Sequence, residues 1–134
     1  MAEGFYETSK ALSEYLLFHY GKPEEVLPWC FGPSDALGYP SRCVNKCVAV
    51  DRLTPNARAL DLGCAVGRST FELARYCTKA IGIDLSESFI ATASQLQREG
   101  QLDYSFAVEG ELGQAAIARA SINSPYVWLR FTGN

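Results

Sequence analysis

The sequence predicts an α/β protein with a parallel sheet, because short apolar segments of strand character alternate with segments of helical spacing. Two predicted strands, residues 57–62 and 80–83, lie on either side of a predicted helix over residues 69–76. Asp61 stands at the end of the first strand and Asp84 directly after the second. Ligands of such sheets bind outside the carboxyl ends of the strands. We therefore expect both acidic residues near a ligand.

Residues 1–56 are predicted to form a helical and lid-like extension ahead of the sheet. A first helix is expected over residues 6–20, where apolar residues recur at helical spacing until Gly21. Prolines and glycines punctuate residues 21–41, which predicts an ordered loop or lid whose aromatic residues pack against the protein. These aromatic residues are Trp29, Phe31 and Tyr39. A second helix is expected over residues 42–53. Its predicted buried side consists of Cys43, Val44, Cys47, Val48 and Val50.

Residues 57–134 are predicted to contain the sheet. Ser86 is a suitable N-cap for a helix that runs to Gly100, with Phe89, Ile90, Ala93 and Leu96 as its packing stripe. Alternating apolar residues over 102–108 predict a third strand, and residues 112–120 are expected to form a further helix.

Composition and charge exclude several classes of protein. The chain has 134 residues, which suits one domain, and its net charge of −3 provides no broad basic surface for nucleic acid or an anionic membrane. No apolar run approaches the roughly 18 residues of a membrane span. The first residues also lack the basic and apolar regions of a secretory signal. We expect a cytoplasmic protein without a nucleic-acid or membrane partner; the sequence gives no indication of its oligomeric state.

The five cysteines are expected to be free thiols, because their number is odd and nothing marks the chain as secreted. Cys43 and Cys47 are spaced to share one helical face, but a zinc site needs two more soft ligands. His19 is the only histidine. Buried thiols are the better interpretation, and no metal is predicted.

The segment after the first predicted strand is suited to ligand binding. It reads Gly63-Cys64-Ala65-Val66-Gly67, and its two glycines let the backbone turn sharply and approach a ligand closely. A dinucleotide site needs Gly-x-Gly-x-x-Gly for the pyrophosphate, whereas Ala65 and Arg68 stand in place of the second and third glycines. A nicotinamide-dependent oxidoreductase is therefore disfavoured. The turn suits a cofactor that carries an amino acid, with Asp61 offering a carboxylate to a cationic ligand.

Two further acidic residues fit a nucleoside-containing cofactor. Asp84 lies 21 residues beyond Gly63, a spacing at which an acid accepts hydrogen bonds from ribose hydroxyls. The alternative is a structural turn followed by an ordinary surface aspartate. Glu111, just past the third predicted strand, is placed to meet an adenine amino group. It is equally consistent with an acid favoured by a helix dipole.

These residues resemble class I S-adenosylmethionine-dependent methyltransferases. The stretch Ala59-Leu60-Asp61-Leu62-Gly63-Cys64-Ala65-Val66-Gly67-Arg68-Ser69 is similar to their first motif, and Gly82-Ile83-Asp84-Leu85-Ser86 to the second. The resemblance implies a Rossmann-like fold with S-adenosyl-L-methionine as cofactor. The cofactor-binding residues that it implies are Asp61, Gly63, Cys64, Ala65, Gly67, Asp84, Leu85 and Glu111.

Over roughly residues 5–111 the chain resembles one subfamily, the 4-mercaptohistidine N1-methyltransferases, which also form the C-terminal domain of the ovothiol-synthesising enzyme. The resemblance rests on Tyr6-Glu7-Thr8, Leu12 to Gly21, Phe31-Gly32-Pro33, Tyr39 to Val44 and the Gly-Cys-Ala-Val-Gly turn. It implies methylation of an imidazole nitrogen of 5-thiohistidine, a small-molecule substrate.

Four side chains outside the two cofactor motifs are candidates for substrate or cofactor contacts. Arg42 suits a carboxylate of either ligand, or is a solvated arginine at a helix start. Tyr6 and Tyr15 would close over the cofactor, or are packing residues. His19 is a possible base near neutral pH, but its apolar helix face favours a hydrogen-bonded core histidine.

The sequence predicts only the N-terminal half of a fold that normally has seven strands. Residues 126–131 are expected to form a strand, yet they lack the Asp-centred pattern that the resembled family carries after its third helix. An open parallel edge would leave backbone groups unpaired. The second hypothesis is therefore a truncated, non-catalytic remnant that binds at most the cofactor or a partner chain.

Overall fold

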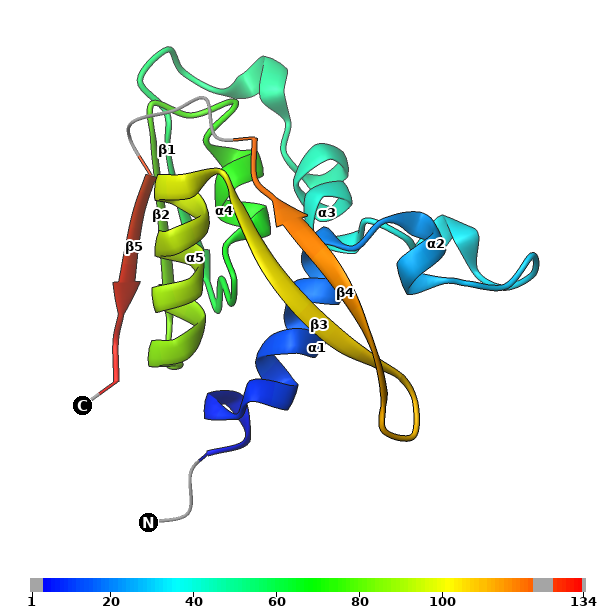
Figure 1. The fold of residues 1–134 in the computed structure, drawn as a ribbon. Coiled ribbons are helices and arrows are strands. Elements are labelled where there is room, and N and C mark those ends of the chain that lie inside the picture. Colours follow the sequence, from blue (N-terminus) through cyan, green and yellow to red (C-terminus); the bar gives the residue numbers. More distant parts are fainter. Residues whose placement is uncertain (1–3, 122–126, 134) are drawn as a thin grey trace.

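A computed structural model describes residues 4–121 and 127–133 (Figure 1). Its elements are η1 (Phe5–Glu7), α1 (Ser9–Tyr20), α2 (Pro23–Val26), η2 (Ser34–Ala36), α3 (Tyr39–Cys47), η3 (Val50–Arg52), β1 (Arg58–Leu62), α4 (Arg68–Leu73), β2 (Lys79–Asp84), α5 (Glu87–Glu99), β3 (Gln101–Glu109), β4 (Leu112–Arg119) and β5 (Val127–Phe131). The predicted strands at 57–62, 80–83 and 102–108 and the helices at 6–20, 69–76 and 86–100 are confirmed within a few residues.

A parallel sheet with the strand order β1-β2-β5 forms the centre of the fold. Leu62 of β1 lies opposite Ile83 of β2, and Asp84 of β2 lies opposite Phe131 of β5. The carboxyl ends of all three strands therefore meet at one edge, at the lower end of Figure 1. The α/β class with a parallel Rossmann-like sheet is as predicted; Tyr126 of the last predicted strand lies outside the described residues.

The third strand of the parallel sheet is β5, and the expected helix over residues 112–120 is wrong. This segment is β4, which pairs antiparallel with β3 in a separate hairpin across a turn at Gly110. Gly110 has a φ of +56°, and the buried residues Ala116 and Ala118 alternate with exposed ones. The alanines favour a helix by propensity, but their alternation buries one face of the hairpin, and tertiary packing decides.

Helix α5 is fixed at both ends by the residues predicted to do so. The Ser86 hydroxyl accepts a hydrogen bond from the Phe89 amide, and Gly100 ends the helix with a φ of +75°. Its buried stripe is Phe89, Ile90, Ala93 and Leu96, as the spacing predicts. Phe89 and Leu96 belong to one core with Leu16 of α1 and Ala118 of β4, so the hairpin and the first helix share the packing of α5.

The segment between α1 and β1 differs from the prediction in its burial. Trp29 and Phe31 stack on each other with ring centroids 6.4 Å apart, yet remain 66% and 73% exposed, so the expectation that they pack against the protein is wrong. The helix predicted over residues 42–53 is shorter and starts earlier, because Gly38 and Pro40 begin it and Val48 caps it. Of its expected buried side, Val44 is buried, while Cys47 and Val50 are exposed.

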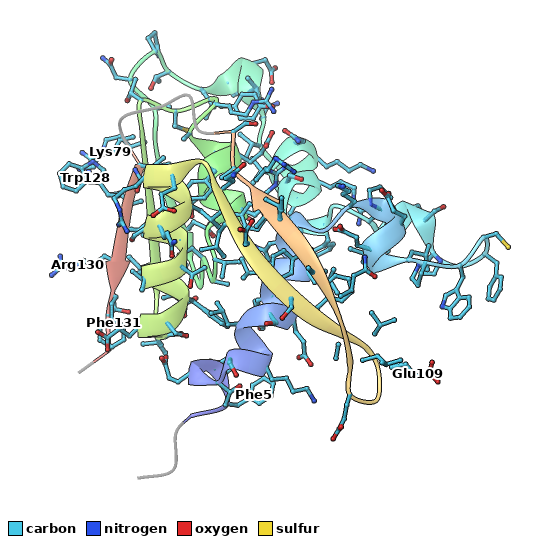
Figure 2. All side chains as sticks on the ribbon, viewed as in Figure 1. Phe5, Lys79, Glu109, Trp128, Arg130 and Phe131 are labelled. Atoms are coloured by element: carbon cyan, nitrogen blue, oxygen red, sulfur yellow. The ribbon has the colours of Figure 1, made fainter. Side chains whose placement is uncertain are left out.

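One face of the parallel sheet carries exposed apolar side chains. Leu60 and Leu62 of β1 are 58% and 70% exposed, and Trp128 of β5 is 59% exposed. Figure 2 shows Trp128, Lys79 and Arg130 projecting outward from the sheet, away from α5. The Lys79 ammonium lies 4.8 Å from the centre of the Trp128 ring. Within the described residues, no helix is long and apolar enough to cross a membrane.

Candidate functional site

A cavity of about 560 Å³ lies at the carboxyl edge of the parallel sheet. Its size is within the range of small-molecule sites. Strand ends, the turn after β1, the start of α5 and the N-terminal segment all contribute to it. The residues lining it are Gly4, Tyr6, Glu7, Tyr15, Leu62, Gly63, Ala65, Ile83, Asp84, Leu85, Ser86, Phe89 and Thr132.

The turn between β1 and α4 is held open toward the cavity by its backbone. Gly63 has a φ of +72° and Ala65, the one non-glycine residue with positive φ in the described chain, a φ of +47°. The amides of Gly63 and Cys64 both donate to the Ile83 carbonyl, at 2.9 and 3.0 Å. A β-carbon built on Gly63 meets no atom within 4 Å. The glycine therefore leaves space for a ligand beside the backbone.

Asp84 faces the cavity with its carboxylate already fixed. One oxygen accepts from the Ala65 amide at 2.8 Å, and the other accepts from the Ser86 amide at 2.9 Å. A carboxylate offers about four acceptor positions, so two bonds leave capacity for a ligand's hydroxyl groups. The strained backbone at Ala65 aims its N–H at Asp84, which joins the turn after β1 to the end of β2.

Asp61 does not line the cavity. Its carboxylate accepts a hydrogen bond from the Thr70 hydroxyl at 2.7 Å. Burial raises the pKa of Asp61, the Thr70 bond opposes this, and the nearby negative charge of Asp84 raises the pKa further. The structure therefore gives Asp61 a contact inside the fold, where it connects β1 to α4.

Cys64 and Gly67 also lie behind the cavity wall. The Cys64 side chain is 2% exposed and packs where a β-carbon on Gly82 would lie, 2.9 Å from the Cys64 sulfur. Burial raises the pKa of this thiol to about 12, so it is neutral and unreactive. Gly67 is the N-cap of α4 with a φ of +86° and is tightly packed against Phe71 and Ala93.

Three aromatic rings form one wall of the cavity. Tyr15 of α1 lies 4.6 Å from Phe89 of α5 between ring centroids, and Tyr6 of η1 lies 6.2 Å from Tyr15 and 6.1 Å from Phe89. Phe89 is buried, whereas Tyr6 is 54% exposed. Burial raises the pKa of Tyr15, so its phenol stays protonated at neutral pH. The two tyrosines that the sequence singled out therefore meet at the cavity with a helix residue that it assigned to packing.

Glu111 and Arg42 lie away from the cavity. The prediction that Glu111 sits at the carboxyl edge of the parallel sheet is wrong, because it lies in the β3–β4 turn; Figure 2 labels Glu109 beside it. The Arg42 guanidinium donates to the carbonyls of Leu37 and Ala36, at 3.2 and 3.4 Å, and lies over the Tyr39 ring. Arg42 thus fixes the start of α3.

His19 is a half-buried residue of α1. Burial lowers its pKa to about 4, with a smaller contribution from the Arg68 charge. Its Nδ1 atom is buried with no hydrogen-bond partner among the described residues. The core interpretation of His19 is therefore the better one, although the expected hydrogen bond at Nδ1 is missing.

Several cavity residues were not anticipated. Thr132 follows β5, and its amide and hydroxyl both donate to the Asp84 carbonyl, at 3.0 and 3.2 Å. Finding Thr132 from the sequence requires knowing that β5, and not β3, pairs with β2. Glu7 belongs to the Tyr6-Glu7-Thr8 segment and Ser86 caps α5, and neither feature alone predicts a position on the cavity wall.

Comparison with known proteins identifies the family. A family model described as a methyltransferase domain matches residues 59–126. An uncharacterized RNA methyltransferase of Chlorobaculum tepidum is 41% identical over 49 residues, which cover 37% of this chain and 10% of that protein. The chain thus spans about a tenth of the length of this curated relative.

Two solved structures are similar at a low level. The YcgJ protein from Bacillus subtilis has 18% identity and a TM-score of 0.44, covering 71% of this chain and 30% of that one. Phosphoethanolamine N-methyltransferase 1 of Haemonchus contortus, in complex with phosphoethanolamine and S-adenosylhomocysteine, has 13% identity and a TM-score of 0.46, covering 98% of this chain and 24% of that one. Similarity at this level has no bearing on the ligand of this chain.

The cavity fits S-adenosyl-L-methionine, the cofactor of the methyltransferase domain family that matches residues 59–126. It offers open space beside Gly63, unused acceptor positions on Asp84 and an aromatic wall, and its volume suits a nucleoside joined to an amino acid. The family match spans the turn after β1, the end of β2 and the start of α5, which form part of the cavity wall. The chain belongs to the methyltransferase domain family, whose cofactor is S-adenosyl-L-methionine.

Proposed function

We propose that this chain binds S-adenosyl-L-methionine in the cavity at the carboxyl edge of the sheet and presents it for transfer of its methyl group to a small molecule. The observation that carries the proposal is the fixed carboxylate of Asp84. Two backbone amides orient it toward a cavity whose neighbouring turn is kept open by Gly63.

Each wall of the cavity has a part in holding the cofactor. Asp84 accepts hydrogen bonds from vicinal ribose hydroxyls, since its amide bonds leave acceptor positions free. The turn at Gly63 admits the methionine portion beside the backbone. Leu85 and Thr132 provide the surface next to the ribose acid on which an adenine ring packs.

When bound, the sulfonium of the cofactor supplies an electrophilic methyl carbon. The chain's own contribution is orientation and exclusion of water, which are sufficient because the leaving group is already activated. The rings of Tyr6 and Tyr15 carry negative π faces that favour a cation next to them. Asp61 acts through the fold, because its bond to Thr70 fixes the start of α4 after the turn.

For the methyl acceptor we propose an imidazole nitrogen of 5-thiohistidine. Support comes from the sequence resemblance of the Tyr6-Glu7-Thr8 segment, the stretch through α1 and the Gly-Cys-Ala-Val-Gly turn to the 4-mercaptohistidine N1-methyltransferases. The ring nitrogen forms a bond to the methyl carbon as the carbon–sulfur bond breaks, and the nitrogen's proton leaves to solvent.

Cofactor binding is tested by titration calorimetry with S-adenosylhomocysteine, and NAD is titrated separately as the competing ligand. We expect heat with S-adenosylhomocysteine and none with NAD. Asp84→Ala should weaken S-adenosylhomocysteine binding at least about tenfold, because the ribose loses a charged acceptor. Asp103→Ala, on the hairpin away from the cavity, is the matched control. A folded chain that binds NAD alone would overturn the proposal.

The acceptor is tested by mass spectrometry of 5-thiohistidine and histidine incubated with the chain and the methyl donor. Methylated thiohistidine without methylated histidine is the expected product. The exposed apolar face of Leu60, Leu62 and Trp128 favours a second candidate, in which the chain binds the cofactor and a partner chain without turnover. Heat with S-adenosylhomocysteine but no methylated product would favour this candidate.

A further inference from the structure

The N-terminal segment is attached to the start of α5 by an unusually complete set of hydrogen bonds. We call this segment, residues 4–8, the strap. Glu7 accepts from the Glu87 amide at 3.0 Å and from the Ser88 amide at 3.2 Å, one bond to each carboxylate oxygen. The hydroxyls of Ser86 and Ser88 donate to the carbonyl of Tyr6 at 3.1 and 3.2 Å.

These bonds satisfy donors that the helix cannot satisfy itself. The first amides of a helix have no intrahelical acceptor. In α5 the Ser86 hydroxyl accepts a hydrogen bond from the Phe89 amide. The carboxylate of Glu7 accepts from the amides of Glu87 and Ser88, which lie between them in the sequence. A carboxylate is well suited to this position, because the helix N-terminus carries partial positive charge. The polar Ser86 side chain beside Glu7, together with the Ser88 and Glu87 amides, outweighs burial and lowers the pKa of Glu7.

Apart from these bonds, the contacts of the Tyr6 ring with Tyr15 and Phe89 and the Thr8 cap of α1, the strap is open to solvent. None of the residues of η1 is buried, and Phe5 and Tyr6 are 59% and 54% exposed. Segments with little buried surface open at low free-energy cost. Release of the strap carries away the Tyr6 ring, which belongs to the cavity wall together with Glu7.

Ser86 connects the strap to the proposed cofactor acid. Its amide donates to Asp84, while its hydroxyl donates to Tyr6 of the strap. The residue is 2% exposed, so its position is fixed. The closed strap and the oriented Asp84 therefore share one anchoring residue.

We propose that Glu7 is a positioning residue that latches the strap over the cofactor cavity, so that cofactor enters and leaves through opening of this latch. The inference rests on the proposed function, since it assumes that the cavity binds the cofactor. The latch is formed without ligand, so breaking it lowers the barrier to both entry and exit. Association and dissociation should accelerate together, and affinity should change less than either rate.

The test uses S-adenosylhomocysteine as probe and surface plasmon resonance to measure both rate constants. Glu7→Ala removes both amide bonds and Glu7→Gln keeps a single acceptor oxygen, so we expect roughly three- to tenfold faster rates for the first and a smaller change for the second. Glu24→Ala, which removes an exposed acid on α2 away from the cavity, is the matched control and should leave both rates unchanged.

Hydrogen exchange of the ligand-free protein tests the latch independently of the cofactor. The Glu87 and Ser88 amides should be protected in the unaltered chain and in Glu24→Ala, and should lose protection in Glu7→Ala. Faster dissociation with unchanged association would overturn the latch proposal. That result is expected of a weakened or destabilised site, whereas an opened latch also accelerates association. Unchanged exchange at both amides would also overturn it. If the unaltered chain does not bind S-adenosylhomocysteine, the cofactor proposal is refuted, and the role of the latch in cofactor entry is refuted with it. Hydrogen exchange at the Glu87 and Ser88 amides then still shows whether Glu7 holds the strap.

Discussion

Replacing Gly63 by alanine is the sharpest test of where the cofactor lies. The residue adopts a φ of +72°, where an L-residue such as alanine is strained by about 1–2 kcal/mol. Nothing lies within 4 Å of the added β-carbon, so packing contributes no further cost. We expect the free energy of unfolding to fall by this amount, which lowers the melting temperature by roughly 3–8 °C in a chain of this size.

Ligand binding should suffer more than stability in this variant. The new methyl group projects into the open space beside the turn, where the proposed cofactor passes close to the backbone. Overpacking a well-fitted contact costs about 1–3 kcal/mol, which corresponds to a loss of affinity for S-adenosylhomocysteine of roughly 5- to 150-fold. Calorimetry measures the affinity, and thermal unfolding monitored by circular dichroism measures the stability.

Gly67→Ala is the matched control, because Gly67 has a similar φ of +86° but faces the core. Its β-carbon would lie 3.1 Å from the Phe71 ring and 3.2 Å from the Ala93 β-carbon. Overpacking therefore adds about 1–3 kcal/mol to the strain, and the free energy of unfolding should fall further than in Gly63→Ala. The affinity of the folded Gly67→Ala protein for S-adenosylhomocysteine should change less than that of Gly63→Ala. A folded Gly63→Ala chain that binds S-adenosylhomocysteine within twofold of the unaltered chain would refute the placement of the cofactor at this turn.

Three further predictions concern the fold. Because burial lowers the pKa of His19 to about 4, against about 6.5 in the unfolded chain, the unfolded state takes up the proton first as pH falls. Stability should therefore decrease by about 2.5 kcal/mol between pH 7.5 and pH 4.5 in urea unfolding, and a steep slope that persists in His19→Phe would contradict this. Thr70→Val should cost about 1–3 kcal/mol of unfolding free energy by removing the bond from buried Thr70 to Asp61, whereas Thr70→Ser should retain most of that bond; equal losses would argue against it. Trp128→Ser should reduce the binding of a hydrophobic dye with little change in stability, and unchanged dye fluorescence would show that this face is not the exposed apolar surface.

The parts of the fold that were predictable are those in which local signals agree with one another. Around α5 the Ser86 cap, the apolar stripe and Gly100 all indicate the same helix. At β1 and β2 the apolar runs end at Asp61 and Asp84, and the structure pairs the two strands in parallel. These elements can be predicted from the sequence because each signal depends only on neighbouring residues.

The hairpin shows where such local reasoning ends. Residues 112–120 are rich in alanine, but Ala118 and Ala120 are buried in one core with residues of α1 and α5. These partners lie outside any local window of the segment, so its own residues do not predict a strand. The consequence extends to the site. Because β3 pairs with β4 and not with β2, Glu111 lies at a hairpin tip, away from the parallel sheet. Thr132 lies instead just past the end of the third parallel strand, β5.

The cavity has walls of two origins, the ends of the parallel strands and the N-terminal segment. Gly63, Asp84 and Thr132 lie at or just past the ends of three adjacent strands. The Gly63 amide donates to the Ile83 carbonyl and the Thr132 amide to the Asp84 carbonyl, so backbone bonds join these strand ends. Such contacts depend on the sheet and little on side-chain identity elsewhere. The strap contributes the remaining wall through Tyr6 and Glu7, from the opposite end of the sequence. Substitutions in the strap that leave Ser86 in place should therefore alter access to the cavity with little effect on the strand ends that we propose hold the cofactor. Rate constants for strap variants and affinities for variants of the turn are the measurements that distinguish access from cofactor binding.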